Sequence, residues 1–221
     1  MLKIFIFIII NLSFHICQCQ CDLNDIVDLM CGNHDHLPIF NPYIYNDPIY
    51  KSTNNCYSFA IMDRLPKNLR DHKLQPGEEA HLPNINTRSY GCSLFRHYVL
   101  KDHPTYFFRD GRDNAPCPCG YFKAALYITD NNDINIDYHW YRQGNKHWYH
   151  KPGSSSVETL DARGDMIYDP EVADRDYSFK NGPNYSISCG YLCVEANMNE
   201  MDINNDLNDP DLQYSYVPSS I

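Results

Sequence analysis

Apolar and polar positions in the middle of the chain predict an antiparallel β-sheet. Tyr121 to Thr129 is an apolar run of β-type residues, followed by a turn cluster of Asp and Asn at 130–133. Ile134 to Gln143 and Lys146 to Lys151 are further strand-like runs, joined by the two-residue hairpin signal Gly144-Asn145. These runs predict a three-stranded meander. Shorter strand-like segments are Tyr106–Phe108, Val157–Leu160 and Met166–Tyr168.

Two helices are predicted before this sheet. Asn54 or Asn55 can cap a helix that carries Cys56 and ends before Pro66. Apolar side chains recur at helical spacing from Ser89 to Leu100, which predicts a second helix. The sequence therefore indicates an α+β fold, in which a helix packs on an antiparallel sheet.

The hairpin signal also predicts which residues face each other. A two-residue loop at Gly144-Asn145 pairs Gln143 with Lys146, Tyr141 with Trp148 and His139 with His150. Residues opposite each other project to the same face of a sheet, with Cβ atoms roughly 5 Å apart. We therefore expect the two imidazoles to be neighbours.

Cys56, His139 and His150 are the residues that a thiol nucleophile requires. The partial positive charge of a helix N-terminus favours a thiolate at Cys56, and His139 would take its proton. His150 would orient His139 through a hydrogen bond, which completes a set of nucleophile, base and orienting residue. The backbone amide of Cys56 and a second donor from Asn54 or Asn55 would hold the oxyanion.

The N-terminal segment predicts secretion. A positively charged start and an apolar run from Ile4 to Leu12 mark residues 1–19 as a signal peptide. A retained membrane anchor is the alternative, but the run is shorter than the roughly 20 residues of a membrane span. The remainder divides into an irregular lead-in at 20–50, a Cys–His domain at 51–195 and an acidic tail at 196–221.

Cysteine usage agrees with an oxidising compartment. Without the two cysteines of the signal segment, eight of the ten remain, which permits four disulfides. Cys117-Pro118-Cys119 and Cys189-x-x-x-Cys193 would staple the centre of the chain to its C-terminal part, with zinc binding as the alternative. Cys56 is then either a free thiol, which leaves another cysteine unpaired, or one half of a bridge.

The formal net charge of −10 restricts the partners. It argues against nucleic acid, because phosphate binding needs a basic surface. We predict no cofactor and no metal site, since neither His34-Asp35-His36 nor His139, His147 and His150 form a familiar ligand set. The stretch from Asp202 to Asp206 begins like a calcium loop but lacks its Gly and Glu. We therefore expect the tail to be a solvated, disordered end, with weak calcium or mineral contact as the alternative.

Two short motifs indicate surface functions. Arg163-Gly164-Asp165 is a tripeptide that adhesion receptors recognise, and it also suits a plain turn. Asn184-Tyr185-Ser186 is an N-glycosylation sequon, which a secreted chain can use.

Several blocks occur in an order that resembles a known family. They are Asn55-Cys56-Tyr57-x-Phe59-Ala60, Asp137 to Arg142, His150 to Gly153, Asp161 to Pro170 and Cys189 to Val194. Across residues 50–194 this order resembles bivalve insoluble shell-matrix proteins and related bacterial proteins. The Cys-then-His layout also resembles papain-like cell-wall peptidases and amidases, which implies a disulfide-braced papain-like fold with Cys56 as nucleophile, His139 as base and His150 as the third polar residue.

Two functions follow as expectations. The first is a secreted, extracellular component of the organic matrix of calcified shell, built on a papain-like domain, whose partners are other matrix proteins or calcium mineral. The alternative is an active secreted cysteine peptidase or amidase that uses Cys56, His139 and His150 on a peptide or cell-wall substrate. Neither expectation involves nucleic acid or a membrane.

Overall fold

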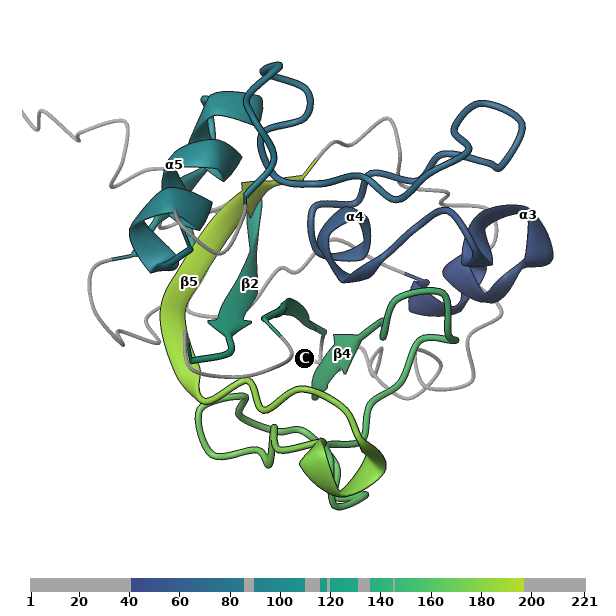
Figure 1. Ribbon diagram of the computed structural model, residues 1–221, viewed down its shortest axis with the longest axis vertical. Coiled ribbons are helices and arrows are strands. Elements are labelled where there is room, and N and C mark those ends of the chain that lie inside the picture. The colour runs from purple at the N-terminus through teal and green to yellow at the C-terminus, as the bar shows by residue number, and fades with distance from the viewer. Residues whose placement is uncertain are drawn as a thin grey trace, which may run out of the picture. The chain divides into compact units, whose positions relative to one another are not determined.

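The structure is a computed structural model that describes residues 41–85, 90–109, 116–118, 120–130, 136–144 and 146–196. All of these belong to one compact unit, which spans 35–221 (Figure 1). The predicted signal peptide, most of the lead-in and the predicted acidic tail beyond residue 196 lie outside the described residues.

The described chain contains short helices and a single five-stranded sheet. The helical segments are η1 (Pro42–Asn46), α3 (Pro48–Lys51), α4 (Cys56–Ala60), α5 (Cys92–Asp102) and η2 (Ser178–Lys180). The strands are β1 (Phe107–Phe108), β2 (Tyr121–Ile128), β3 (Tyr138–Gln143), β4 (Trp148–His150) and β5 (Ile187–Glu195). The predicted α+β class is thus confirmed.

The strands are ordered β1-β5-β2-β3-β4, and each neighbouring pair is antiparallel. The consecutive strands β2, β3 and β4 form the predicted meander. The predicted edge strands after β4 are reduced to isolated bridges, His150 to Glu158 and Leu160 to Met166.

The pattern analysis missed β5, which lies inside the sheet between β1 and β2. Its sequence carries Cys189, Gly190 and Cys193, and glycine within a strand weakens the strand pattern. Gly190 adopts a φ of 92°, and the pairing of β5 with β2 shifts register between Leu126 and Tyr127. The glycine therefore marks an irregularity that lets the strand continue.

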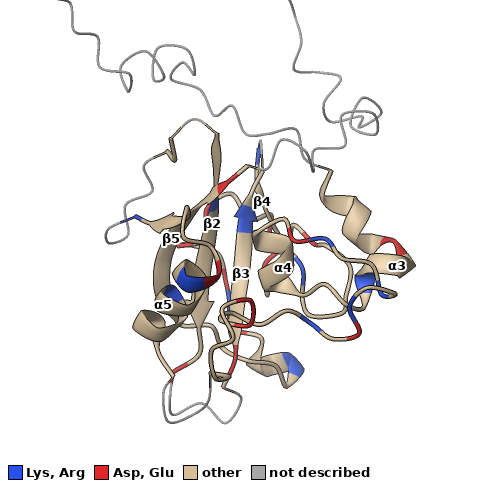
Figure 2. Ribbon diagram, turned by 90° about the horizontal axis from the view of Figure 1, so that it is seen from above, with Lys and Arg blue, Asp and Glu red and all other residues tan. Residues whose placement is uncertain are grey.

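The two faces of the sheet have different covers. On one face, Trp140, Leu126 and Leu192 form a hydrophobic cluster with buried side chains of α4 and α5. Tyr141 and Tyr191 belong to a second cluster, which includes Ile167 and Tyr185 from the long segment after β4. Figure 2 shows α4 beside β3, at the side of the sheet where β4 also lies.

The predicted register of the β3–β4 hairpin is wrong by two residues. Tyr141 pairs with His150 and Gln143 pairs with Trp148, so the connection is longer than two residues. Gly144 does not adopt the positive φ that a two-residue type I′ turn requires. Glycine is needed there for packing instead, because a Cβ at this position would clash with the ring of Tyr149.

Two disulfides fasten β5 to earlier parts of the chain. Cys92 at the start of α5 is bonded to Cys189, and Cys117 is bonded to Cys193. The predicted stapling is confirmed for Cys117 and Cys193, whereas Cys189 pairs with Cys92 and Cys119 lies outside the described residues. Within the described ranges, no helix has both the length and the apolar character needed to span a membrane.

Candidate active site

Cys56 is the first residue of α4, and its position is fixed by the residue before it. The side chain of Asn55 accepts a hydrogen bond from the Ser58 amide at 3.0 Å, and the Ser58 hydroxyl accepts one from the Asn55 amide at 2.8 Å. This reciprocal capping box satisfies two amides that the helix itself leaves unpaired. Cys56 forms no disulfide in the described part of the chain, and its side chain is buried.

The sulfur of Cys56 lies against the backbone on both sides of residue 139. The sulfur is 3.9 Å from the Tyr138 carbonyl oxygen, and it accepts a hydrogen bond from the backbone amide of Trp140. Because β4 pairs only with residues 141–143, this first half of β3 has no partner from β4, and the start of α4 lies against it. The thiol thus contacts the backbone that flanks residue 139, whereas the His139 ring packs with Tyr141, Tyr185 and His150. No hydrogen bond joins the sulfur to that ring among the residues that the structure describes.

His139 and His150 are hydrogen-bonded to each other. The distance from His139 Nε2 to His150 Nδ1 is 2.8 Å, and His150 Nε2 lies 2.9 Å from the Leu160 carbonyl oxygen. The register shift of two residues keeps both side chains on one face, so the imidazoles meet diagonally instead of directly. The ring of Tyr185 stacks on His139 with centroids 5.2 Å apart.

The Leu160 carbonyl fixes the tautomers of both rings. A carbonyl only accepts, so the proton of neutral His150 must be on Nε2, which leaves Nδ1 as an acceptor. His139 must then donate from Nε2, and its Nδ1 carries a lone pair. No hydrogen bond to His139 Nδ1 is found within the described residues. This is the protonation state that a general base requires.

Burial keeps all three groups neutral at rest. It raises the pKa of the Cys56 thiol to about 12, and the Asp137 carboxylate adds to this, while the amides of Trp140, Tyr57 and Cys56 act against it. Burial, followed by the neighbouring His150, lowers the pKa of His139 well below its ordinary value. Burial also lowers the pKa of His150 to about 4, against the opposing effect of the Leu160 carbonyl.

Lys151 supports the turn that leads into α4, and the sequence analysis did not identify it. Its ammonium donates to the carbonyl oxygens of Lys51, Asn54 and Gly153 at 2.7, 2.5 and 2.8 Å. Burial lowers the pKa of Lys151 to about 8, but three carbonyl acceptors match the three N–H groups of the charged form. The Lys151 side chain is fully buried. A sequence gives no sign of this, because lysine is almost always a surface residue.

Asp137 and Tyr185 form a second supporting pair that the sequence analysis did not identify. The Tyr185 hydroxyl donates to Asp137 at 2.9 Å, and Asp137 also accepts from the Tyr138 amide at 2.8 Å. Tyr185 therefore joins the carboxylate near the thiol to one face of the His139 ring. Its position 46 residues after His139 gives no local signal of this contact.

The side-chain amides of Asn54 and Asn55 serve the scaffold instead of an oxyanion site. Asn54 donates to the carbonyl oxygens of Tyr50 and Leu65, and Asn55 donates to that of Leu74. The backbone amides of Cys56 and Tyr57 lie beside the sulfur and remain the nearest candidates for stabilising negative charge.

The predicted surface motifs lie away from this centre. Arg163, Gly164 and Asp165 are exposed at a turn, and Arg163 Nε pairs with Asp174 at 2.7 Å. Asn184 is half-buried and forms an isolated bridge with Asp176.

The described residues contain no group of three or more His, Cys, Asp or Glu side chains arranged to hold a metal. Of the groups considered as metal ligands in the sequence, His34-Asp35-His36 and the stretch from Asp202 to Asp206 lie outside the described residues. His139 and His150 instead bond to each other.

The chain matches no family model, and no curated protein or solved structure is significantly similar to it.

Proposed function

We propose that this chain is a cysteine-dependent acyl-transfer enzyme that hydrolyses amide or peptide bonds. One observation supports this most directly: a free thiol lies against the backbone that flanks His139, and the His139 ring is oriented by His150 with its Nδ1 unprotonated. A buried cysteine with only a packing role needs neither an ordered imidazole pair nor a fixed tautomer.

The proposed reaction begins from neutral groups. Substrate binding brings a carbonyl carbon to Cys56 Sγ; the thiol proton moves to His139 Nδ1 as the sulfur attacks, forming a C–S bond and an oxyanion. The resulting imidazolium is stabilised by its bond to His150. His139 then returns the proton to the leaving amine as the C–N bond breaks, and water cleaves the thioester by the same route.

The neutral resting state gives this site a particular character. A thiol with a pKa of about 12, together with a poorly basic imidazole, yields very little thiolate at neutral pH. Proton transfer is then expected only when substrate is bound, with the amides of Cys56 and Tyr57 near the developing charge.

Trapping of an acyl-enzyme tests the proposal. The full secreted chain is incubated with a panel of peptide amides and activated esters and examined by intact-mass and peptide mass spectrometry. An acyl adduct on Cys56 that is absent in Cys56→Ser, and formed about 10²-fold or more slowly in His139→Gln, would support the enzyme. His147→Gln on the same hairpin is the control and should leave the rate unchanged. Adduct formation that is equally fast without His139 would refute it.

The burial of the centre favours a second candidate function. The exposed fractions of Cys56, His139 and His150 are 6, 4 and 1 %, which also suits an inherited hydrolase core used as a rigid scaffold. In this role the chain is a secreted, disulfide-braced component of calcified shell matrix, whose net charge of −10 provides contact with calcium or mineral. Recovery of the protein from the decalcified, insoluble shell fraction would support this role. The Cys56→Ser variant should then be retained on mineral as well as the unaltered protein is. Absence from that fraction would refute it.

A further inference from the structure

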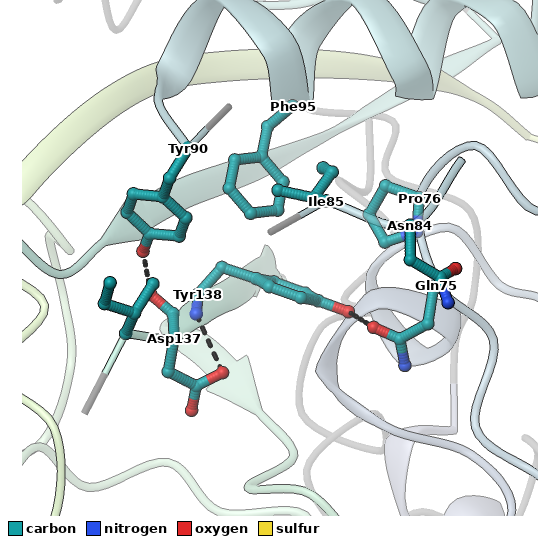
Figure 3. A pocket seen from close by; sticks show the side chains of 9 residues that line it. Gln75, Pro76, Asn84, Ile85, Tyr90, Phe95, Asp137 and Tyr138 are labelled. Atoms are coloured by element: carbon teal, nitrogen blue, oxygen red, sulfur yellow. Dashed lines mark hydrogen bonds between the residues drawn. The ribbon is translucent and has the colours of Figure 1, made fainter. Parts of the chain in front are cut away.

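A cavity of about 430 Å³ is lined in part by Asp137 and Tyr138, the two residues that precede His139 in the chain (Figure 3). Its walls include the rings of Tyr90, Phe95 and Tyr138, together with Ile85 and the polar side chain of Asn84. Its volume is within the range of about 300–1,000 Å³ that is typical of small-molecule sites.

The aromatic walls are arranged to receive another ring. The centroids of Tyr90 and Phe95 are 5.5 Å apart with the rings nearly perpendicular, and those of Phe95 and Tyr138 are 5.0 Å apart at 55°. Offset and edge-to-face arrangements of this kind are the ones that aromatic rings prefer. These rings are already in contact with one another, so an added ring would pack against their cavity side and extend the same arrangement.

Most polar groups of the cavity are already paired within the protein. The Tyr138 hydroxyl donates to Gln75 at 2.8 Å, and the Tyr90 hydroxyl bonds to Thr129 and to the Asp137 carbonyl. The Asp137 carboxylate accepts from the Tyr138 amide and from Tyr185. A ligand therefore needs an apolar surface, and Asn84 at the exposed end is the remaining polar group that it can reach.

Tyr138 connects this cavity to the thiol. Its ring forms one wall, while its carbonyl oxygen lies 3.9 Å from Cys56 Sγ. A substrate whose reacting carbonyl reaches the sulfur would extend past Tyr138 towards this cavity.

We propose that the cavity is the pocket for an aromatic side chain next to the bond that Cys56 cleaves. This inference rests on the proposed function and specifies its substrate class: acyl compounds of the aromatic amino acids. Aliphatic side chains lose the ring contacts, and acidic side chains would also lie near the Asp137 carboxylate in the wall.

Binding is measured first, without catalysis, on the full chain carrying Cys56→Ser. The probes are N-acetyl-L-phenylalanine amide and N-acetyl-L-alanine amide, observed by saturation-transfer NMR. The phenylalanine amide should bind at least tenfold more tightly. Asn84→Trp, which fills the open end, should weaken it at least tenfold, whereas Pro83→Trp on the adjacent exposed residue should not. Equal binding of the two amides, or no effect of Asn84→Trp, would overturn the proposal.

Turnover then separates this proposal from the proposed function. With an unmodified Cys56, kcat/KM should favour a phenylalanyl over an alanyl ester at least tenfold, and Asn84→Trp should remove the preference. Turnover without this preference would refute the role of the cavity as an aromatic pocket, while the proposed enzyme activity would stand. Selective binding of the phenylalanine amide with no Cys56 adduct from any substrate would remove both the enzyme and the cavity's role in recognising substrate, leaving a ligand site.

Discussion

The groups at the candidate centre have limited contact with water, and this controls their chemistry residue by residue. Cys56, His139 and His150 each have exposed fractions of 6 % or less. Transfer of a charged group to such surroundings costs free energy, so thiol and imidazoles alike are held in their neutral forms. Reactivity then depends on events that change these surroundings, such as substrate binding.

The alkylation rate of Cys56 should rise steeply with pH. A pKa of about 12 leaves a thiolate fraction of about 10⁻⁵ at pH 7, so the rate should increase about tenfold per pH unit between pH 7 and 10. The measurement is site-resolved mass spectrometry after brief iodoacetamide treatment, with Cys56→Ser as the blank. A rate that is constant above pH 7 would instead indicate a preformed thiolate–imidazolium pair.

His150 should make the protein less stable in acid. Its pKa is lowered to about 4 in the folded chain, against about 6.5 when unfolded, so the unfolded chain binds more protons between these values. The contribution of His150 to the unfolding free energy is complete above pH 6.5 and is lost as the pH falls towards 4. By pH 4.5 the loss amounts to about 2–3 kcal/mol.

Urea unfolding at pH 7.5 and 4.5 measures this loss. His150→Gln should reduce the difference in unfolding free energy between the two pH values by about that amount. His97→Gln, on the exposed side of α5, is the control and should not change it. An unchanged difference in His150→Gln would show that His150 remains protonated when folded.

At the scale of elements, the exposed turn at 161–165 depends on one carboxylate. Asp161 accepts the amides of Arg163, Asp165 and Asp174 at 2.9, 3.0 and 2.9 Å. Asp161→Ala leaves these donors without their acceptor and should lower the unfolding free energy by about 1–3 kcal/mol in thermal or urea melts. Asp165→Ala in the same turn should cost less than about 0.5 kcal/mol, and equal losses would contradict this account.

The elements also show which parts of the structure local patterns can predict. The helix start at Cys56 and the meander follow from capping residues and apolar alternation, and both are present. The common face of His139 and His150 survives a two-residue register error because side-chain direction repeats every two residues. The error itself arose because Gly144 is required by the ring of Tyr149, a contact that turn chemistry does not describe.

Other parts of the site depend on contacts between distant residues. Lys151 is 100 residues from one of its carbonyl partners, and sequence patterns give lysine as a surface residue. Tyr185 and the Leu160 carbonyl lie in irregular segments without periodicity. β5 was missed because its cysteines and glycine resemble a bridge motif more than a strand.

At the scale of the whole molecule, the two disulfides close long loops. Cys92 and Cys189 are separated by 97 residues, and Cys117 and Cys193 by 76. Loops of this length correspond to about 4–5 kcal/mol each in the chain-entropy account, and observed losses are about 2–5 kcal/mol.

The double variant Cys92→Ala/Cys189→Ala should therefore lose about 2–5 kcal/mol of unfolding free energy, measured by denaturant titration without reductant. Addition of reductant should destabilise the unaltered protein by more than this, because both bridges open. A loss below 1 kcal/mol in the double variant would mean that the sheet does not depend on this connection.

The place of β5 has a consequence for biosynthesis. The strand that fills the gap between β1 and β2 is the last one of the described chain to be made. A ribosome-bound chain that ends before residue 187 has β2 with one open side and both cysteines of β5 still absent. Assembly of the sheet must therefore wait until nearly all of the domain has emerged, and earlier release would leave an exposed strand edge prone to pairing with other chains.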